Sequence, residues 1–392
     1  MNSNRRGFLR GAAALGVAPL FVPRSAWGAN DRVAFAVIAT GGRGRYLLEK
    51  FQNTGSECVA ICDVYEPNLE AAQKLAPSAK AYGDYRELLG QSGIDAVVIA
   101  SPDHQHAPML FAALDAKKDV YLEKPLSKSL EQSRQMIDAV RKSKQVVQIG
   151  MQRRSAESIM KAKALVDDGV LGRITHVKPQ WHWNIAKPLN NTPLPGKLDW
   201  TRFLGSAPKR ELEPMRFRYW RYFWDYSGGN MTDQGTHLMD VVEWFTKSGA
   251  PKSAIMQGYV AKMEGAEHPD VFTAVFEFPN FMATWTLNYS NSYENGWSIT
   301  FQGDKATMIL DDDGYLVFSE PWKKGAAPAY EEKAPVPVES HIANFLDCIK
   351  SRHDPNCTVE IAAQAVAGPH LANLAFRAGK KMTLATDGGR AS

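Results

Sequence analysis

Three side chains near the middle of the sequence have the types and spacing of an acid–base group. Asp233, His237 and Asp240 are separated by four and three residues, so they share one face if residues 233–245 form a helix. A histidine between two carboxylates is held in one tautomer and becomes more basic, as a general base requires. The alternative is an amphipathic helix with a capping Asp233 and a satisfied core histidine.

A lysine occupies a second position that could take part in chemistry. Glu123-Lys124-Pro125 follows the extended stretch Val120 to Leu122, so Lys124 is expected at the carboxyl end of a strand. Ligands bind at that end of open parallel sheets. An ammonium group there can stabilise the alkoxide that develops as a hydride leaves a carbinol carbon. The alternative is a solvated loop lysine.

A glycine turn near the N-terminus suggests a binding site for a pyrophosphate. The apolar stretch Val33 to Ile38 predicts a buried strand, and Tyr46 to Phe51 predicts a helix. The backbone N–H groups of such a turn and the helix N-terminus favour phosphate oxygens. Ala39 replaces the first glycine of the pattern, which a small residue tolerates if its φ is negative. The predicted cofactor-binding residues of the turn are Thr40, Gly41, Gly42, Arg43 and Gly44.

Two further strand ends carry polar residues. Asp63 ends the apolar stretch that starts at Cys58, about 20 residues after the turn, where a carboxylate can bind both ribose hydroxyls and repel a 2′-phosphate. This favours NAD over NADP. The second end is the segment Ser101-Pro102-Asp103-His104-Gln105-His106, which follows the strand-like Ala96 to Ala100. His104 and His106 are not expected to bind a metal, because no acidic cluster accompanies them.

These residues require a sheet that brings strand ends together. Apolar strands that do not alternate, separated by helical stretches, fill residues 33–150 and predict a doubly wound parallel sheet of the Rossmann type. Strand-like hairpins begin at Val271, and two helices, Ser340 to Ser351 and Val359 to Ala378, close the chain. Residues 184–230 predict a long irregular stretch. The expected fold class is α/β, with a second, mostly antiparallel sheet.

The first 28 residues resemble an export signal. Arg5 and Arg6 precede the uncharged run Gly11 to Pro23 and a small-x-small site, Ala26-Trp27-Gly28. We therefore expect twin-arginine export to the periplasm or outside the cell. The signal holds four arginines and no acid, so its removal takes the formal charge from +4 to zero. The basic character thus indicates no nucleic-acid partner. No apolar run is long enough to predict a membrane span.

The four cysteines are expected to be free and mostly buried. Cys58 and Cys62 lie four residues apart on one predicted strand, at roughly 13 Å, which is too far for a disulfide. Cys348 and Cys357 could meet only if the intervening loop folded back. No spacing among the four suggests a metal site.

The order of these motifs resembles that of the Gfo/Idh/MocA oxidoreductases, over nearly the whole mature chain. The resemblance implies an N-terminal Rossmann domain and an open C-terminal sheet that often forms an oligomer interface. It implies that Lys124 is catalytic, with Asp233 and His237 as partners, and that a cis peptide precedes Pro125. The segment Gly150 to Arg154 would line nicotinamide and substrate. The further cofactor-binding residues expected are Asp63, Ser101, Pro102, His104, His106, Glu123 and Gln152; the substrate-binding residues are Arg153, Trp183 and Asp240.

The sequence therefore predicts an exported oxidoreductase that uses NAD, or NADP, on a sugar, sugar derivative or polyol, and retains its cofactor. Aromatic residues such as Trp181 and those of Arg218 to Trp224 suit sugar rings but could equally form core or interface. The alternatives are a glycosidase or lyase that oxidises its substrate transiently, and a non-catalytic binding or assembly protein. We expect a homo-oligomer, and domain limits at residues 1–28, 31–151 and 152–392.

Overall fold

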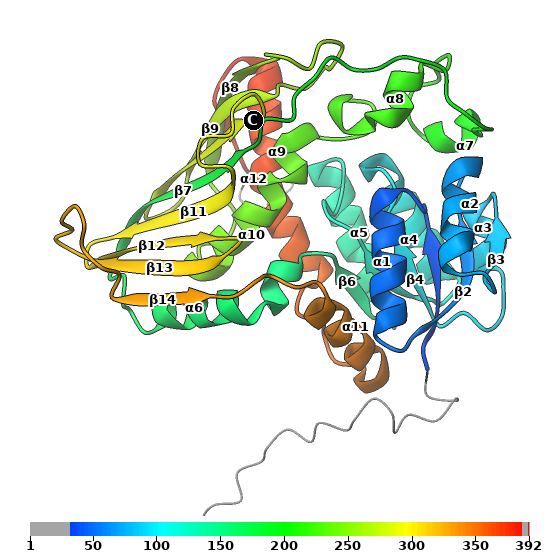
Figure 1. The fold of residues 1–392 in the computed structure, drawn as a ribbon, viewed down its shortest axis with the longest axis horizontal. Helices are drawn as coiled ribbons and strands as arrows, with labels where there is room; N and C mark the ends of the chain where they lie inside the picture. The colour runs from blue at the N-terminus through cyan, green and yellow to red at the C-terminus, as the bar shows by residue number, and fades with distance from the viewer. Residues whose placement is uncertain (1–31, 386–390, 392) are drawn as a thin grey trace, which may run out of the picture. The chain divides into compact units, whose positions relative to one another are not determined.

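A six-stranded parallel sheet forms the first half of the fold (Figure 1). The computed structural model describes residues 32–385 and residue 391, so the predicted export signal lies outside the described residues. The strand order is β3-β2-β1-β4-β5-β6, and every neighbouring pair is parallel. The strands are β1 (Ala34–Ile38), β2 (Glu57–Cys62), β3 (Lys80–Tyr82), β4 (Ala96–Ile99), β5 (Asp119–Leu122) and β6 (Val147–Ile149).

Helices cover both faces of this sheet because its strands are apolar on both sides. Residues of β1 alternate between two hydrophobic clusters: Phe35 and Val37 pack on one face, and Ala36 and Ile38 on the other. Ser129 caps the N-terminus of α5 by accepting from the Gln132 N–H. The helices of this half are α1 (Gly42–Asn53), α2 (Glu66–Leu75), α3 (Tyr85–Leu89), η3 (Asp103–Gln105), α4 (His106–Asp115) and α5 (Leu130–Lys142).

The second half is built on a nine-stranded sheet of order β14-β13-β12-β11-β7-β10-β9-β8-β15. The pair β7 and β10 is parallel and the other pairs are antiparallel. The predicted α/β fold class with a mostly antiparallel second sheet is confirmed. The strands are β7 (Ile174–His182), β8 (Ser253–Tyr259), β9 (Val271–Glu277), β10 (Met282–Asn288), β11 (Gly296–Gly303), β12 (Ala306–Asp311), β13 (Gly314–Ser319), β14 (Tyr330–Lys333) and β15 (Met382–Thr383).

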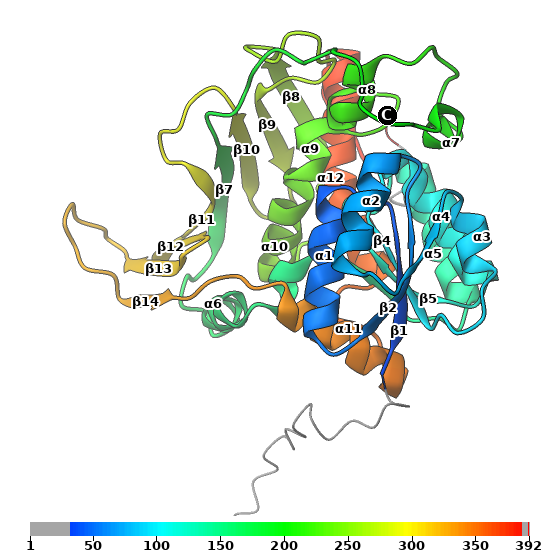
Figure 2. The same ribbon diagram turned by 45° about the vertical axis from the view of Figure 1, so that its right-hand side comes forward.

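One face of the second sheet is buried, as the alternation along its strands requires. In β10, Ala283, Trp285 and Leu287 are buried and their neighbours are not. Helices pack on the buried face (Figure 2). The helices of this half are η4 (Gln152–Ser155), α6 (Glu157–Asp167), α7 (Trp200–Leu204), α8 (Pro214–Arg218), η5 (Trp220–Tyr222), α9 (Gly229–Asp233), α10 (Gly235–Thr246), α11 (Glu339–Ser351) and α12 (Val359–Ala378).

The last two helices return to the first sheet. Ile342 and Phe345 of α11 join the hydrophobic cluster of Phe35. Val359 and Ala362 of α12 join the cluster on the other face of that sheet, while Leu371 and Ala372 of the same helix belong to the core of the second sheet. Helix α12 therefore connects the two cores, and the domain limits stay a prediction.

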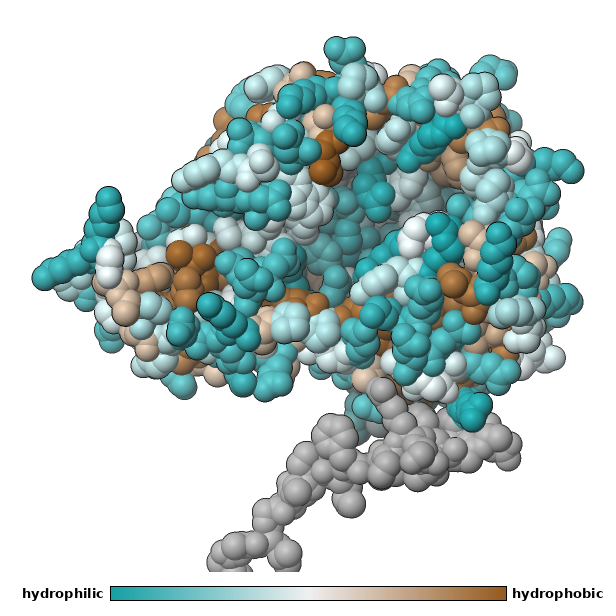
Figure 3. Space-filling model, in the orientation of Figure 1, coloured by the Kyte–Doolittle hydropathy of each residue, from teal (hydrophilic) through white to brown (hydrophobic). Residues whose placement is uncertain are grey.

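The predicted irregular stretch has a small core of its own. Phe203, Leu204, Phe223 and Tyr226 form a separate buried cluster. Figures 1 and 2 both show α7 and α8 at one end of the parallel sheet. The face of the protein that Figure 3 shows is hollowed near its centre, and mainly hydrophilic residues surround the hollow.

The four cysteines are free and buried, which confirms that prediction. Burial raises the pKa of the Cys58 thiol to about 12, so this thiol is not a reactive nucleophile. Within residues 32–385 and residue 391, no helix is long and apolar enough to cross a membrane. The same residues contain no group of three or more His, Cys, Asp or Glu side chains that could hold a metal ion.

Candidate active site

The glycine turn departs from expectation at its first residue. Ala39 has φ 68°, in the left-handed region, so the condition of a negative φ is not met. The tight turn requires this conformation: the Ala39 N–H donates to the Cys62 carbonyl at 2.8 Å, and a Cβ at Gly44 would lie 2.0 Å from the Ala39 oxygen. An alanine in this region is strained by roughly 1 kcal/mol relative to glycine.

The turn opens into a cavity that suits a dinucleotide. Helix α1 begins at Gly42, and among the described residues no side chain caps its N-terminus. Its unpaired N–H groups and its dipole are therefore available to an anion. A Cβ at Gly42 would meet no described atom within 4 Å, so the backbone there is open to a ligand. The cavity has a volume of about 530 Å³ and is lined by Ala39, Gly41, Gly42 and Asp63, among others. These residues fit a dinucleotide.

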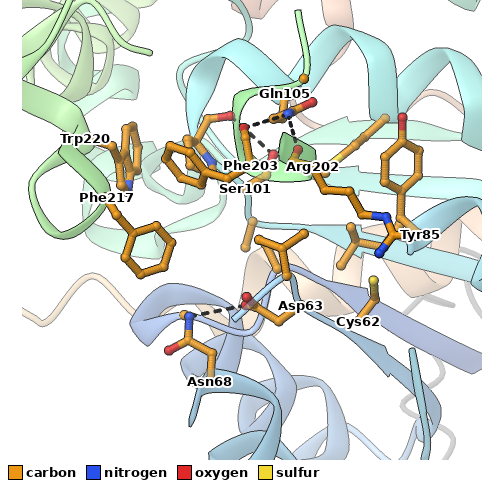
Figure 4. Close-up of a pocket in the computed structure, with 18 of the residues that line it drawn as sticks. Cys62, Asp63, Asn68, Tyr85, Ser101, Gln105, Arg202, Phe203, Phe217 and Trp220 are labelled. Atoms are coloured by element: carbon orange, nitrogen blue, oxygen red, sulfur yellow. Dashed lines mark hydrogen bonds between the residues drawn. The ribbon is translucent and has the colours of Figure 1, made fainter. Parts of the chain in front are cut away.

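Asp63 is held rigidly at the cavity wall. Its Oδ2 accepts from the Thr40 N–H at 2.7 Å and from the Asn68 amide at 3.3 Å, and its Oδ1 accepts from the Tyr65 N–H at 2.9 Å. Burial raises the pKa of Asp63, and these hydrogen bonds oppose the shift. Figure 4 shows Asp63 and Asn68 on one side of the cavity. Thr40 thus orients Asp63 and links the turn to the end of β2.

Two arginines that the sequence analysis missed reach the same cavity. Arg86 comes from α3 and Arg202 from α7, and both line the wall near Asp63. Asp84 lies 3.3 Å from Arg86 and 3.4 Å from Arg202. No local pattern places them there, since α7 lies far from β2 in the sequence.

Ser101 and Pro102 line the cavity, but His104 and His106 do not. In the described part of the chain, neither histidine is among the lining residues of the two cavities that contain the other candidates. The His104 Nε2 pairs with the Phe203 carbonyl at 2.8 Å. The His106 ring nitrogens pair with the Pro125 and Ser101 carbonyls at 2.7 and 2.9 Å. Both histidines thus satisfy buried carbonyls, and their expected contact with the cofactor stays a prediction.

A smaller cavity, of about 210 Å³, holds the proposed catalytic groups. Lys124, Gln152 and His237 line it, with Arg43 and Glu123. Arg43 pairs with Glu123, with Nε and Nη2 at 2.8 and 2.6 Å from Oε1. The turn is thereby joined to the loop that carries Lys124. The cis peptide predicted between Lys124 and Pro125 is present.

Lys124 and Asp233 form an ion pair, as their expected partnership requires. The Lys124 Nζ donates to Oδ1 of Asp233 and also to its backbone carbonyl, the latter at 3.0 Å. Arg221, which the sequence analysis missed, donates through Nε to the other carboxylate oxygen at 3.0 Å. Burial would raise the pKa of Asp233, but Arg221 and Lys124 outweigh it and hold that pKa well below its ordinary value.

His237 does not contact the two flanking carboxylates, so the expected acid–base group is corrected. Gln234, between α9 and α10, keeps helical dihedral angles, and its N–H donates to the Asn230 carbonyl at 3.1 Å. Asp240 accepts from Arg154 at 2.8 Å instead. The His237 Nδ1 has no hydrogen-bond partner among the described residues. Burial, followed by the charges of Arg153 and Lys124, lowers the pKa of His237 well below its usual value. The ring is therefore neutral.

Arg153 and Trp183, expected to bind substrate, pack on the aromatic side chains of the second sheet. The Arg153 guanidinium lies 3.8 Å from the centre of the Trp297 ring, and burial lowers its pKa to about 10. Trp183 stacks on Tyr289 at 5.7 Å. Neither Arg153 nor Trp183 is among the described residues that line the two cavities. A direct substrate contact for them, and for the Arg154-bound Asp240, stays a prediction.

Two family models match the chain. Residues 33–151 match an oxidoreductase family with an NAD-binding Rossmann fold, and residues 159–309 match the GFO/IDH/MocA C-terminal domain. Together they span more than half of the chain. The chain belongs to the Gfo/Idh/MocA family. Its first half is accordingly the family's NAD-binding Rossmann domain.

Relatives with assigned activities match part of this Gfo/Idh/MocA chain. Inositol 2-dehydrogenase/D-chiro-inositol 3-dehydrogenase of Lacticaseibacillus casei is 35% identical over 168 residues, which are 41% of this chain and 47% of that protein. The chain thus spans about half the length of the first such relatives. The uncharacterized oxidoreductase YrbE of Bacillus subtilis is 26% identical over 86% of this chain and 92% of its own.

Solved structures share the fold across both halves. Levoglucosan dehydrogenase in complex with NADH and levoglucosan has a TM-score of 0.71 at 16% identity, covering 91% of this chain and 100% of that chain. The WlbA dehydrogenase from Bordetella pertussis, in complex with NADH and UDP-GlcNAcA, has a TM-score of 0.70 at 20% identity, covering 90% and 99%. At these identities the likeness establishes the fold alone.

Proposed function

We propose that this protein transfers a hydride between NAD and a CH–OH carbon of a sugar, sugar derivative or polyol, with NADP as the alternative cofactor. The observation that carries the proposal is the contact between the two cavities. Ala100, Ser101, Trp220 and Arg221 line both of them. The cavity of the glycine turn therefore lies next to the cavity of Lys124 and His237, as hydride transfer between two bound molecules requires.

Different residues of the chain bind the cofactor and carry out the proton and charge transfer. Gly41 and Gly42 hold the pyrophosphate at the start of α1, and Asp63 faces the ribose. A nicotinamide bound there would supply the acceptor for the hydride of the carbinol carbon. The Lys124 ammonium stabilises the developing alkoxide, and the neutral imidazole of His237 takes the hydroxyl proton. Asp233 orients Lys124, with which it is paired, and not His237.

Product analysis with a panel of sugars and polyols tests this proposal. The panel includes inositols and levoglucosan, because relatives or structural neighbours carry those names, and glycosides as the contrasting class. A keto-sugar or lactone formed together with reduced nicotinamide is the expected result. Glycosidic cleavage without net redox change would instead establish the transient-oxidation alternative. Sugar binding without turnover at any pH would favour a binding or assembly protein.

We also propose that the protein is exported through its twin-arginine signal and retains its cofactor. Free NAD is not expected to be regenerated outside the cytoplasm, so a second substrate would re-oxidise the bound nucleotide. Localisation is tested by fractionating cells that express the full chain and a variant with Arg5 and Arg6 changed to Lys. Retention is tested by measuring nucleotide released when the purified protein is denatured. A purified protein that releases no nucleotide contradicts retention.

We further propose a homo-oligomer that uses the uncovered face of the second sheet. Ile255, Tyr259 and Met282 point to this face with exposed fractions of 39%, 63% and 41%. Apolar side chains exposed together on a sheet favour burial against a partner. Light scattering of the wild type and of Ile255→Lys measures the mass. A monomeric wild type contradicts the proposal.

A further inference from the structure

A strap, defined here as residues 193–221, crosses the carboxyl ends of the parallel strands. The Val64 carbonyl accepts from the Asp199 N–H at 2.8 Å, and the Glu66 N–H donates to the Lys197 carbonyl at 2.9 Å. Beyond β4, the Phe203 carbonyl pairs with the ring of His104 at 2.8 Å. The strap is therefore fastened at the ends of two strands that also border the dinucleotide cavity.

The aromatic side chains of the strap close one side of that cavity. Phe203, Phe217 and Trp220 lie opposite Asp63, with the cavity between them (Figure 4). Phe217 also packs edge-on against Tyr65 at 4.9 Å, next to the end of β2. A dinucleotide bound at the glycine turn would thus be enclosed by the turn on one side and by the strap on the other.

The last residue of the strap reaches the catalytic ion pair. The Arg221 guanidinium lies 4.4 Å from the centre of the Trp220 ring and donates to Oδ2 of Asp233 at 3.0 Å. Lys124 occupies Oδ1 of the same carboxylate. The Asp233 side chain is 10% exposed, so each of its two oxygens is held by a cation in a largely buried setting. Trp220 and Arg221 line both cavities.

We propose that Arg221 is a positioning residue, through which seating of the strap over the dinucleotide sets the geometry of Lys124. The inference rests on the proposed hydride transfer. Arg221 fixes the orientation of the Asp233 carboxylate and thereby the direction in which the Lys124 Nζ points. Because Arg221 stacks on Trp220, movement of the strap away from the nucleotide withdraws a hydrogen bond from Asp233. The Arg221 side chain thus couples the position of the strap over the dinucleotide to the orientation of Lys124.

A second consequence is electrostatic. Arg221 and Lys124 together hold the Asp233 carboxyl ionised, since both charges lower its pKa. Without Arg221, one cation remains to offset the burial that raises this pKa. Asp233 would then take up a proton at a higher pH and release its hold on Lys124. If Arg221 only stabilised the fold of the strap, its replacement would leave the titration of Asp233 unchanged.

The test compares Arg221→Gln and Arg221→Lys with Arg210→Gln as the matched control. Arg210 lies on the same strap and pairs with Asp225 at 2.5 Å, and it is not one of the described residues lining either cavity. For R221Q we expect kcat to fall by about 10- to 100-fold, the cost of losing a charge-assisted hydrogen bond. The acid limb of its pH–rate profile should move to higher pH. R221K should recover part of kcat, and R210Q should match the wild type.

A second readout is independent of turnover. NADH titration and limited proteolysis of the strap are measured on the same four proteins. NADH should protect the strap of the wild type and of R210Q, and protect that of R221Q less. The inference is overturned if R221Q keeps wild-type kcat, pH profile and protection, or if R210Q changes as R221Q does. If the wild type binds NADH but oxidises no carbinol, the proposed function is contradicted. The proteolysis data then test separately whether Arg221 couples the strap to Asp233.

Discussion

The glycine turn (residues 39–44) and the strap border the same cavity by opposite means. The turn presents backbone: Gly42 leaves open space where a Cβ would stand, and α1 starts there without a side-chain cap among the described residues. The strap presents side chains, with Phe203, Phe217 and Trp220 on the facing wall. The turn supplies backbone N–H groups for an anion, whereas the strap supplies aromatic cover and Arg221, which pairs with Asp233.

Replacing Lys124 should impair catalysis without disturbing the turn or the strap. We expect this change to have the largest effect on activity. Lys124→Met removes the cation that stabilises the alkoxide, so kcat/KM should fall by about 10³-fold or more, while NADH affinity stays within about twofold. Steady-state kinetics and fluorescence titration measure the two quantities. Lys324→Met, at an exposed position in the loop between β13 and β14, is the matched control. Activity that survives in the Lys124 variant would exclude the proposed mechanism.

Acid should loosen the fastening of the strap through His104. Burial lowers the pKa of His104 to about 4 in the folded protein, against 6.5 as its ordinary value. The unfolded chain therefore binds the extra proton first, so the stabilisation is complete above about pH 6.5 and is lost as pH falls towards 4. The loss amounts to about 3 kcal/mol.

Urea unfolding of the wild type and His104→Gln, at several pH values, measures this contribution. The free energy of unfolding of the variant should vary less with pH between about 6.5 and 4 than that of the wild type. His353→Gln, at an exposed position, should keep the wild-type dependence. Equal slopes for wild type and His104→Gln would show that His104 does not carry the acid sensitivity.

The smallest expected effect lies in the turn. Ala39→Gly should raise the free energy of unfolding by about 1 kcal/mol, because glycine adopts a φ of 68° without strain. NADH affinity should change little, since the N–H groups of α1 stay in place. Thermal unfolding with and without NADH measures both. A destabilised variant would mean that the Ala39 methyl group contributes more by packing than it costs by strain.

The residues that the sequence predicted well lie in local patterns. An apolar strand followed by glycines predicts the turn, and Asp63 and Lys124 are recognisable because each ends a strand of a parallel sheet. The partnership of Lys124 with Asp233 came from resemblance to the family. The cofactor contact of His104 and His106 stays a prediction, since polar residues at strand ends can also satisfy buried carbonyls. In the described chain they do so at Phe203, Pro125 and Ser101.

The rest depends on contacts between distant parts of the chain. The spacing of Asp233 and His237 suggests one helix face, and nothing in the local sequence shows that Asp233 pairs with a lysine from the other sheet instead of with the histidine. Arg221 lies in a stretch without periodicity, so its position is set by the fastening of the strap to strands more than 100 residues earlier. Short-range patterns therefore predicted the cofactor side better than the covering side.

The most direct test of the central claim follows the hydride itself. The enzyme is loaded with NAD and given a polyol substrate that is deuterated at the carbinol carbon. The nucleotide is then released, and its mass is measured by mass spectrometry. We expect the reduced nucleotide to carry one deuterium per product formed, because the hydride would pass directly between molecules bound in the two neighbouring cavities. Product that forms while the reduced nucleotide carries no deuterium would contradict the account.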